Sequence, residues 1–550
     1  MKKINKKLYI AFSLFFVVGL NAQTEDQSSA PLDWFNQDQT LNKSNGLGTE
    51  RVYTELLKDV KSTTVIVGVI DSGVDIDHED LKEVIWTNKN EIPGNGKDDD
   101  GNGYIDDVHG WNFIGGKNGK NINYERLEMV RIFRRLDEKY HSKNENEVTD
   151  KSEYKLYLEV KDKIERDRKK VGGQLNQINF IYDQMVDINK LIKSELKIEK
   201  VTKDVLLKFN TEDVKKKQMA ALFATFLQDD KVSLDEFLVE LSEGKEYLNV
   251  RLRYNLNPDY DQRGEIVGDD ENNPFEKNYG NNDVKGEDPK HGTHVSGIIG
   301  AIRGNNIGVN GIADNVKIMP IRAVPNGDER DKDIANAIYY AVDNGCSIIN
   351  MSFGKSYITH KEALEKAIKY AESKGVLLVH AAGNESENID VNPNYPTMKI
   401  GGSKKGCKTW IEVGALSWKM GEELPAGFSN YGKKTVDLFA PGVDIYSTVP
   451  GNKYKSENGT SMACPATAGA AALLKSYFPT LTAIEIKSIL EKSVNKSCKK
   501  NLVNLPSSGM TKGKKVKFSE LSKTGGYVNL YEAVKLAMKK SGKKKIRSKF

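Results

Sequence analysis

Short apolar runs that recur along the chain constrain its fold more than any other feature. The first, residues 63–70 (TTVIVGVI), is continuous and rich in β-branched residues, as in strands buried on both faces of a parallel sheet. Similar runs recur at 316–324, 346–351, 376–381 and 411–415. Between them lie segments with apolar residues at helical spacing, such as 333–343 and 361–373. This alternation predicts an α/β fold, with a mainly parallel sheet, helices on both of its faces, and a site at the carboxyl ends of its strands.

One long segment interrupts the alternation. Residues 120–255 are highly charged and helix-forming, and 124–140 show a weak amphipathic pattern. A stronger three- to four-residue spacing involves Leu175, Ile178, Ile181, Met185, Ile188 and Ile192, which is typical of an amphipathic helix or a coiled-coil pair. We interpret the segment as a helical insertion within one α/β domain. It is either a helical hairpin packed on that domain, which is the simpler interpretation, or a separate binding domain.

The composition is that of a soluble globular protein. The hydrophobic fraction is 38% and the charged fraction 29%, enough for a sizeable core. The net charge of +5 comes from 82 basic and 77 acidic residues. Such a small excess gives no reason to expect a nucleic-acid partner.

The N-terminus has the pattern of an export signal. Lysines at positions 2, 3, 6 and 7 precede a short apolar stretch at 8–20, and Ala22 offers a small residue for cleavage. The stretch is too short for a membrane span, so we expect a mature chain without a transmembrane segment, in a periplasm or outside the cell. The expected divisions are a signal peptide (1–22), an N-terminal segment (23–60), the α/β domain in two parts (61–119 and 256–538), the insertion between them (120–255), and a basic tail (539–550).

The four cysteines are scattered, without the spacing of a zinc site. Cys346 lies in a strand-like run and Cys464 at the start of an Ala-rich helix. We expect both to be buried free thiols.

Three motifs place reactive side chains at the ends of predicted elements. Asp71 (VIDSG) ends the first apolar run, His291 (HGTHV) begins a helix of small residues, and Ser461 (GTSMACP) precedes an Ala-rich helix. A carboxylate, an imidazole and a hydroxyl suit nucleophilic catalysis if they meet. Each motif alone has a simpler interpretation. Asp commonly ends a strand, His291 with His294 could bind a metal although no further His or Cys cluster supports this, and Ser461 could be a plain N-cap.

Taken together, in the order Asp, His, Ser, these motifs resemble those of the subtilisin-like serine peptidases, or subtilases. The resemblance covers roughly residues 60–115 and 260–540. It implies a three-layer fold around a seven-stranded, mainly parallel sheet, and cleavage of internal peptide bonds through an acyl-enzyme on Ser461. His291 would act as general base and then acid, and Asp71 would orient it.

Further segments strengthen the resemblance. Asn384, in VHAAGNE, is similar to the family's oxyanion donor, which acts beside the Ser461 amide. Ser352, Phe353 and Gly354 resemble the strand that pairs with an extended protein or peptide substrate. Ala381, Ala382 and Gly383 would line the other side of the primary pocket, where small residues leave room for a large apolar side chain.

An acidic loop, DDDGNGYIDD, starts at Asp98 and matches much of the EF-hand calcium pattern. Oxygens of Asp98, Asp100, Asn102 and Tyr104 would bind the ion. The twelfth position departs from the pattern, because His109 replaces the usual Glu, and Asp106 or Asp107 could compensate. Asp80 matches a calcium-binding Asp of some family members, although its partner loop differs. We expect calcium as a structural ion and no cofactor for the chemistry itself.

Other interpretations differ in activity. A dedicated processing peptidase with few partners is favoured by the insertion, which could serve as an intramolecular chaperone, lid or docking arm. An inactive binding protein with the subtilase fold is disfavoured by the presence of all three triad positions and Asn384. The sedolisin-like group uses a glutamate as base, and His291 in its motif disfavours it.

Overall fold

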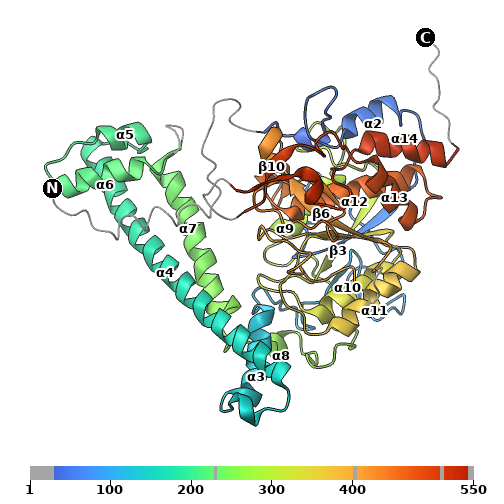
Figure 1. The fold of residues 1–550 in the computed structure, drawn as a ribbon, viewed down its shortest axis with the longest axis horizontal. Helices are drawn as coiled ribbons and strands as arrows, with labels where there is room; N and C mark the ends of the chain where they lie inside the picture. The colour runs from blue at the N-terminus through green and yellow to red at the C-terminus, as the bar shows by residue number, and fades with distance from the viewer. Residues whose placement is uncertain (1–29, 228–231, 400–405, 508–512, 543–550) are drawn as a thin grey trace. The chain divides into compact units, whose positions relative to one another are not determined.

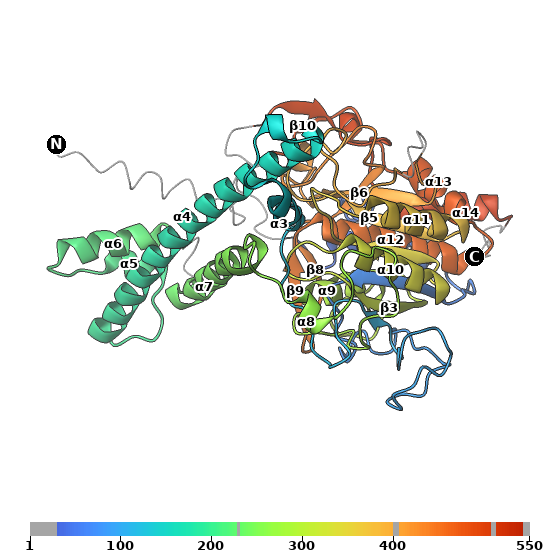
Figure 2. The same ribbon diagram turned by 90° about the horizontal axis from the view of Figure 1, so that it is seen from below.

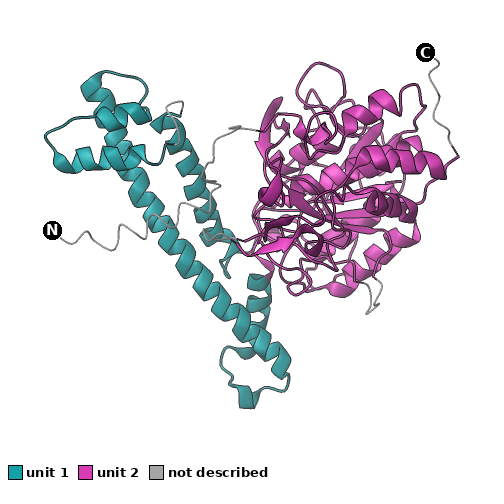
Figure 3. Ribbon diagram, turned by 45° about the horizontal axis from the view of Figure 1, so that its top comes forward, with its two compact units in different colours: residues 1–21, 129–260 teal, residues 22–128, 261–550 magenta. Residues whose placement is uncertain are grey.

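The structure is a computed structural model that describes residues 30–227, 232–399, 406–507 and 513–542. These residues form two compact units (Figure 3). The helical unit contains Met129–Tyr260, and the sheet unit contains the described residues before and after it. The expected signal peptide and most of the expected basic tail lie outside the described residues.

The sheet unit is built on a seven-stranded sheet with the order β2-β3-β1-β4-β5-β6-β7 (Figure 1). All of its pairings are parallel, which confirms the predicted fold class. The strands are β1 (Val65–Asp71), β2 (Trp111–Asn112), β3 (Val316–Arg322), β4 (Ile348–Met351), β5 (Leu377–Ala381), β6 (Trp410–Leu416) and β7 (Leu438–Pro441). The five apolar runs correspond to β1 and β3–β6. β2 has two residues, too few to show a pattern, and β7, a four-residue strand that ends in Pro441, was not predicted either.

Helices cover both faces of the sheet. Successive side chains of a strand point to opposite faces, so each strand contributes to two cores. Val67 and Val69 of β1 share one core with α2 (Thr49–Glu55), α9 (Lys290–Gly300), α12 (Thr460–Tyr477), α13 (Ala483–Ser493) and α14 (Leu530–Lys540). Ile70 shares the other with α10 (Asp331–Asp343) and α11 (Lys361–Ser373), which lie side by side in both ribbon views (Figure 1, Figure 2). The result is the expected three-layer arrangement.

Smaller elements surround the sheet. Two antiparallel pairs, β8 (Ile445–Val449) with β9 (Lys453–Glu457) and β10 (Leu502–Asn504) with β11 (Lys515–Lys517), lie outside it. A single helical turn, α8 (Arg263–Ile266), follows the helical unit in sequence. The N-terminal segment joins the first core through the fully buried Trp34 and Phe35, and the Trp34 indole donates to the Val443 carbonyl at 3.1 Å. This segment is therefore part of the sheet unit.

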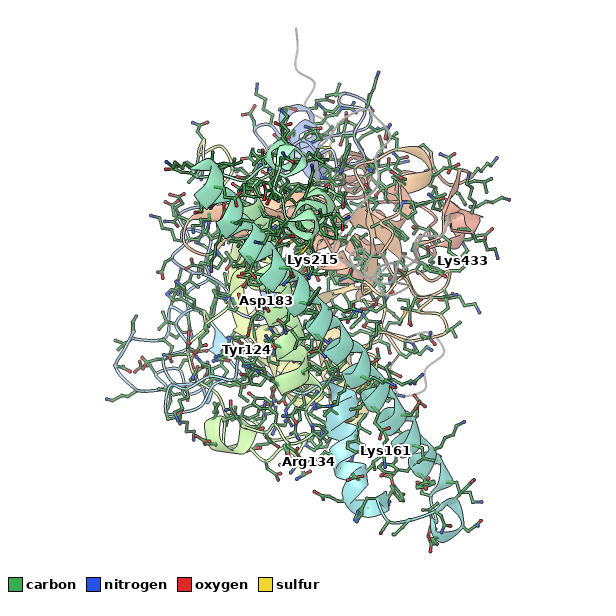
Figure 4. All side chains as sticks on the ribbon, turned by 90° about the vertical axis from the view of Figure 1, so that its left-hand side faces the viewer. Tyr124, Arg134, Lys161, Asp183, Lys215 and Lys433 are labelled. Carbon is green, nitrogen blue, oxygen red and sulfur yellow. The ribbon has the colours of Figure 1, made fainter. Side chains whose placement is uncertain are left out.

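The helical unit has a core of its own. It comprises α3 (Glu128–Tyr140), α4 (Lys151–Leu196), α5 (Lys203–Lys208), α6 (Val214–Ala224) and α7 (Leu234–Val250), the last of which continues into a π-helical turn (Arg251–Asn255). Met185 and Ile188 of α4 pack with Phe223 of α6 and Leu234 of α7. Charged side chains such as Lys161 and Asp183 follow α4 along its length (Figure 4). Within the part of the chain that the structure describes, no helix has both the length and the apolar composition that a membrane span requires.

The unit runs from residue 129 to residue 260, slightly later than the expected limits of 120 and 255. Residues 120–128 belong to the sheet unit because they pair with it; for example, the Glu125 amide donates to the Asn326 carbonyl at 3.1 Å. The ends of the insertion meet at the sheet unit, where Arg126 and Asp261 form an ion pair at 2.6 Å.

Separate cores predict separate unfolding transitions. We expect a variant that lacks residues 129–260, with Glu128 joined to Asp261 by a short Gly-Ser linker, to fold and to keep the melting temperature of the sheet unit within a few degrees. Calorimetry in a Ser461→Ala background, which prevents any self-digestion, measures this.

Phe223→Ala is the matched control in the full chain. It should destabilise the helical unit alone, by about 3–5 kcal/mol. A single transition that moves as a whole in Phe223→Ala, or a deletion variant without any cooperative transition, would contradict the two-core description.

Candidate active site

The three predicted catalytic residues lie at element ends. Asp71 is the last residue of β1, His291 the second residue of α9, and Ser461 the second residue of α12. His291 Nδ1 lies 2.8 Å from Asp71 Oδ1, although the two residues are 220 positions apart in sequence. Asp71 is 2% exposed, and its Oδ1 also accepts the Ser72 amide at 2.8 Å. Because this carboxylate is buried and accepts two hydrogen bonds, it holds the imidazole in one orientation.

This hydrogen bond sets the tautomer of His291. A neutral imidazole that donates from Nδ1 to Asp71 carries its lone pair on Nε2. Partial burial of the ring, whose side chain is 40% exposed, lowers the pKa of His291, but the negative charge of Asp71 and its hydrogen bond outweigh that effect, and the pKa is raised overall. A raised pKa makes Nε2 a stronger base near neutral pH.

Ser461 faces the end of β4. Its hydroxyl donates to the Ser352 carbonyl at 3.1 Å, while the Ser352 hydroxyl donates to the Ser461 carbonyl at 2.9 Å. The Ser461 amide lies in the first turn of α12, where amides have no acceptor within the helix and the dipole favours negative charge. To give its proton to His291 Nε2, the Ser461 hydroxyl has to rotate away from Ser352.

Asn384 is held by its side-chain oxygen, and its side-chain nitrogen has no hydrogen-bond partner among the described residues. Its Oδ1 accepts two hydrogen bonds from Thr460, from the amide at 2.9 Å and from Oγ1 at 3.0 Å. Thr460 is fully buried, and its Oγ1 in turn accepts the Gly383 amide at 3.1 Å. Because the oxygen of Asn384 is engaged by Thr460, the residue before Ser461, Nδ2 remains as a donor near the start of α12.

The two expected substrate-binding segments are neighbours. Ser352, Phe353 and Gly354 follow β4, and Ala381, Ala382 and Gly383 lie at the end of β5. β4 and β5 pair in parallel with Met351 opposite His380, so both segments leave the same edge of the sheet. This edge also carries Asp71.

Sequence reasoning missed Asn394, whose amide lies between these segments. It donates to the Ala381 carbonyl at 3.0 Å. A Cβ added to Gly354 would lie 2.4 Å from Asn394 Nδ2, and one added to Gly383 would lie 3.3 Å from it. The small residues there accommodate this amide, and no local pattern around Asn394 indicated it.

A buried pair beneath the same segment was also missed. His380 Nδ1 lies 2.9 Å from Glu412 Oε1, and the Trp410 indole donates to Glu412 Oε2 at 2.8 Å. In sequence, His380 and Glu412 look like isolated polar residues within strands. They become partners because β5 and β6 pair with His380 opposite Glu412.

The acidic loop is ordered by its own backbone. Asp98 accepts the amides of Asn102 and Gly103 at 3.0 and 2.8 Å, and Asp106 accepts those of Asn95 and Gly96 at 3.1 and 2.8 Å. These two predicted calcium ligands therefore stabilise turns. Tyr104, whose carbonyl was a predicted ligand, has a buried ring that packs against Trp111 and Tyr340.

A different carboxylate set converges beside this loop. Single oxygens of Glu91, Asp100 and Asp107 lie within 4.8 Å of one another, and of the predicted ligands this set contains Asp100. The Asn102 side-chain amide donates to Asp107 Oδ2 at 3.1 Å. Glu91 is 6% exposed, and its Oε2 has no hydrogen-bond partner among the described residues. Such an all-oxygen set with a buried unpaired oxygen fits a hard cation such as Ca²⁺.

Asp80 lies apart from that set. Its carboxylate accepts the Asn305 side-chain amide at 2.7 Å and the Val309 backbone amide at 3.2 Å. Both oxygens thus accept N–H donors, and Asp80 is not among the carboxylates that converge beside the acidic loop.

Thr460→Val tests whether Thr460 orients Asn384. The substitution keeps the shape and the backbone bond but removes the Oγ1 bonds to Asn384 and Gly383. We expect kcat for peptide hydrolysis to fall about tenfold, roughly the 1.4 kcal/mol of one buried hydrogen bond, with KM little changed.

Thr467→Val is the matched control, because Thr467 is equally buried in the same helix and its Oγ1 bonds to the Ala463 carbonyl. Steady-state kinetics on one peptide substrate compare the variants. An equal loss in both would mean that Thr460 acts through stability alone.

The chain matches a family model over most of its length and individual known proteins over a smaller part. The model of the subtilase family matches residues 62–513. A thermophilic serine proteinase from Bacillus sp. (strain AK1) is 42% identical over 38% of this chain and 47% of that protein, and subtilisin E from Bacillus subtilis is 39% identical over 36% and 49%. Among solved structures, a protease chain from Pseudoalteromonas arctica is 30% identical over 45% of this chain and 70% of its own length, with a TM-score of 0.35.

The chain spans about half the length of the two bacterial relatives named here. The family match extends well beyond half of the chain, and it covers both sides of the helical unit and all three motif residues, Asp71, His291 and Ser461. The chain belongs to the subtilase family.

Proposed function

We propose that the chain is an exported serine endopeptidase that hydrolyses peptide bonds through an acyl-enzyme on Ser461. The observation that carries the proposal is the 2.8 Å bond between Asp71 and His291. It lies at the same sheet edge as Ser461 and an Asn384 side chain that is oriented by Thr460. This combination supplies a base, a nucleophile and an oxyanion donor.

The mechanism follows from these positions. His291 Nε2 takes the proton of Ser461 Oγ as that oxygen attacks the scissile carbonyl, and Asp71 stabilises the imidazolium that forms. The oxyanion is bound by Asn384 Nδ2 and the Ser461 amide. His291 then gives its proton to the leaving amine, and water hydrolyses the ester by the reverse sequence. Loss of one oxyanion donor typically lowers kcat by about 10²–10³-fold.

The substrate is an extended segment of a protein or peptide. Backbone groups of Ser352 to Gly354 would pair with it as an added strand, facing Ala381 to Gly383. The Asn394 amide between the segments favours a side chain before the cut that can accept or donate a hydrogen bond. This differs from the large apolar side chain expected from the small residues alone.

Calcium is the structural ion that we propose for the acidic loop, with Glu91, Asp100 and Asp107 as its carboxylate ligands. Bound there, it would neutralise three converging carboxylates and cross-link the loop to the sheet unit through Asp107, which accepts the Tyr340 hydroxyl at 2.6 Å. No chemical step requires it.

A dedicated processing peptidase is the second candidate, and the helical unit favours it. A unit with its own core and no catalytic residue adds a surface on which a particular protein could dock. The deletion variant described above distinguishes the roles: a docking arm predicts lower activity on protein substrates and unchanged activity on a short chromogenic peptide. In a digest of mixed proteins, one or two cleavage sites would indicate processing, and many would indicate degradation.

Calcium should raise the melting temperature of the Ser461→Ala protein by several degrees at about 100 times the dissociation constant, where ligand binding stabilises by roughly 2.7 kcal/mol. Asp107→Asn should remove most of this increase. Asp77→Asn, at an exposed carboxylate of the same unit (side chain 81% exposed), is the control and should keep it. An equal calcium response in Asp107→Asn would reject the ligand set.

Ser461→Ala tests the peptidase itself. We expect the wild-type protein to be labelled by a serine-directed phosphonate probe and to cleave unfolded casein, and the variant to do neither, because it lacks the nucleophile. Circular dichroism verifies that the variant is folded. Equal casein cleavage by both proteins would reject Ser461 as nucleophile, whereas a folded, calcium-supplied wild type that does neither would indicate the inactive binding protein.

A further inference from the structure

The β8–β9 hairpin is fastened along α9, the helix that carries His291. His294 Nε2 lies 3.0 Å from the Lys455 carbonyl of β9. From β8, the Ser447 hydroxyl donates to the His294 carbonyl and the Thr448 hydroxyl to the Thr293 carbonyl, both at 2.8 Å. These three bonds fix the register of the hairpin against the helix.

That register brings two opposite charges together beside His291. Lys290 Nζ, from the residue before His291, lies 2.6 Å from Glu457 Oε1. Glu457 is the last residue of β9 and stands four positions before Ser461. Its side chain is 28% exposed. Burial raises the pKa of Glu457, but the Lys290 charge outweighs that effect and the pKa is lowered overall, so Glu457 is ionised at neutral pH.

The charged and titratable groups around the His291 ring come from three elements. β1 contributes Asp71, α9 contributes Lys290 and His294, and β9 contributes Glu457 and, 3.7 Å from its carboxylate, Lys455. Burial lowers the pKa of His294 to about 4, so its ring is neutral at the pH of interest. Besides Asp71, Glu457 raises the pKa of His291 and Lys290 lowers it.

We propose that the Lys290–Glu457 ion pair is a positioning element of the peptidase that sets the charge balance at His291 from the hairpin side. Glu457 stabilises the imidazolium that forms when His291 accepts the Ser461 proton. Lys290 holds Glu457 in place and offsets its charge, so that the resting His291 stays neutral and able to act as a base. The inference rests on the proposed peptidase function for its kinetic consequence, but not for its electrostatic one.

The two partners should have opposite effects on the acid limb of the pH profile of kcat/KM. Activity is lost as the pH falls and His291 becomes protonated. Glu457→Gln leaves the positive charges of Lys290 and Lys455 uncompensated, so the limb should move to lower pH. Lys290→Met removes the closer of the two charges that offset Glu457, so the limb should move to higher pH. A unit charge at about 10 Å in a water-like medium gives a shift of about 0.3 pH unit, and more where solvent is excluded.

The double variant should return close to the wild-type profile, and 1 M salt should reduce both single shifts. Glu362→Gln is the control, because it breaks a similar ion pair with Lys366 (2.8 Å) on α11, and it should leave the profile unchanged. Shifts of the same sign in both single variants would overturn the proposal.

A measurement without turnover separates this inference from the peptidase assignment. In the Ser461→Ala background, NMR titration of the His291 ring, assigned with a His291→Gln variant, reports its pKa directly. Opposite shifts in Glu457→Gln and Lys290→Met support the proposal even if the wild type cleaves no protein. Unchanged titration in both variants rejects it even if the wild type is an active peptidase.

Discussion

The parallel pairing of β1 between β3 and β4 is the constraint on which the rest of the site depends. Seven residues of β1 pair in register with Val316–Arg322 of β3, and four pair with Ile348–Met351 of β4. Such a strand is buried on both faces, so it cannot slip by one residue without moving its side chains to the opposite core. Asp71 is thereby fixed at the carboxyl end of the sheet, and the 2.8 Å bond to His291 orients the base with it. Ser352, Gly383 and Asn384 follow the neighbouring strands β4 and β5 to the same edge.

The helical unit interrupts the chain between Asp71 and His291 without interrupting the sheet. Glu128, the residue directly before the helical unit, forms an ion pair with Lys355 at 2.8 Å. Lys355 Nζ also lies 2.7 Å from Asp331, and the Lys355 side chain is 1% exposed. Shortly after the helical unit, Arg263 forms buried ion pairs with Asp269 and Asp333 at 2.8 and 2.7 Å. Buried charges of this kind require close partners, so the two segments that flank the helical unit in sequence are anchored within the sheet unit. Lys355 directly follows Gly354, the last residue of the expected substrate-binding segment.

How far the sequence predicts this molecule depends on whether the determining interaction is local. β1 and β3–β6 were predictable because a strand buried on both faces has to be continuously apolar. β2 and β7 were not, because their pairing partners define them more than their own few residues do. The acidic loop shows the same limit. Its spacing indicated Asp98 and Asp106, which accept backbone amides, whereas the carboxylates that converge are Glu91, Asp100 and Asp107, and Glu91 belongs to no recognisable pattern. Asn394 and the His380–Glu412 pair gave no local signal either.

The fold class, the family and the candidate triad were all predictable from the amino-acid sequence, because each of these depends on the chemistry of short segments. Continuous apolar runs predict the parallel strands, and the short motifs around Asp71, His291 and Ser461 predict the reactive groups. The groups that surround them became visible in the folded chain alone: Thr460 behind Asn384, Asn394 between Gly354 and Gly383, and Glu457 beside Lys290. These neighbours come from segments far apart in the chain, and strand register and helix packing bring them within hydrogen-bond or ion-pair distance. Interactions at such short range depend on tenths of an ångström, which no sequence spacing encodes.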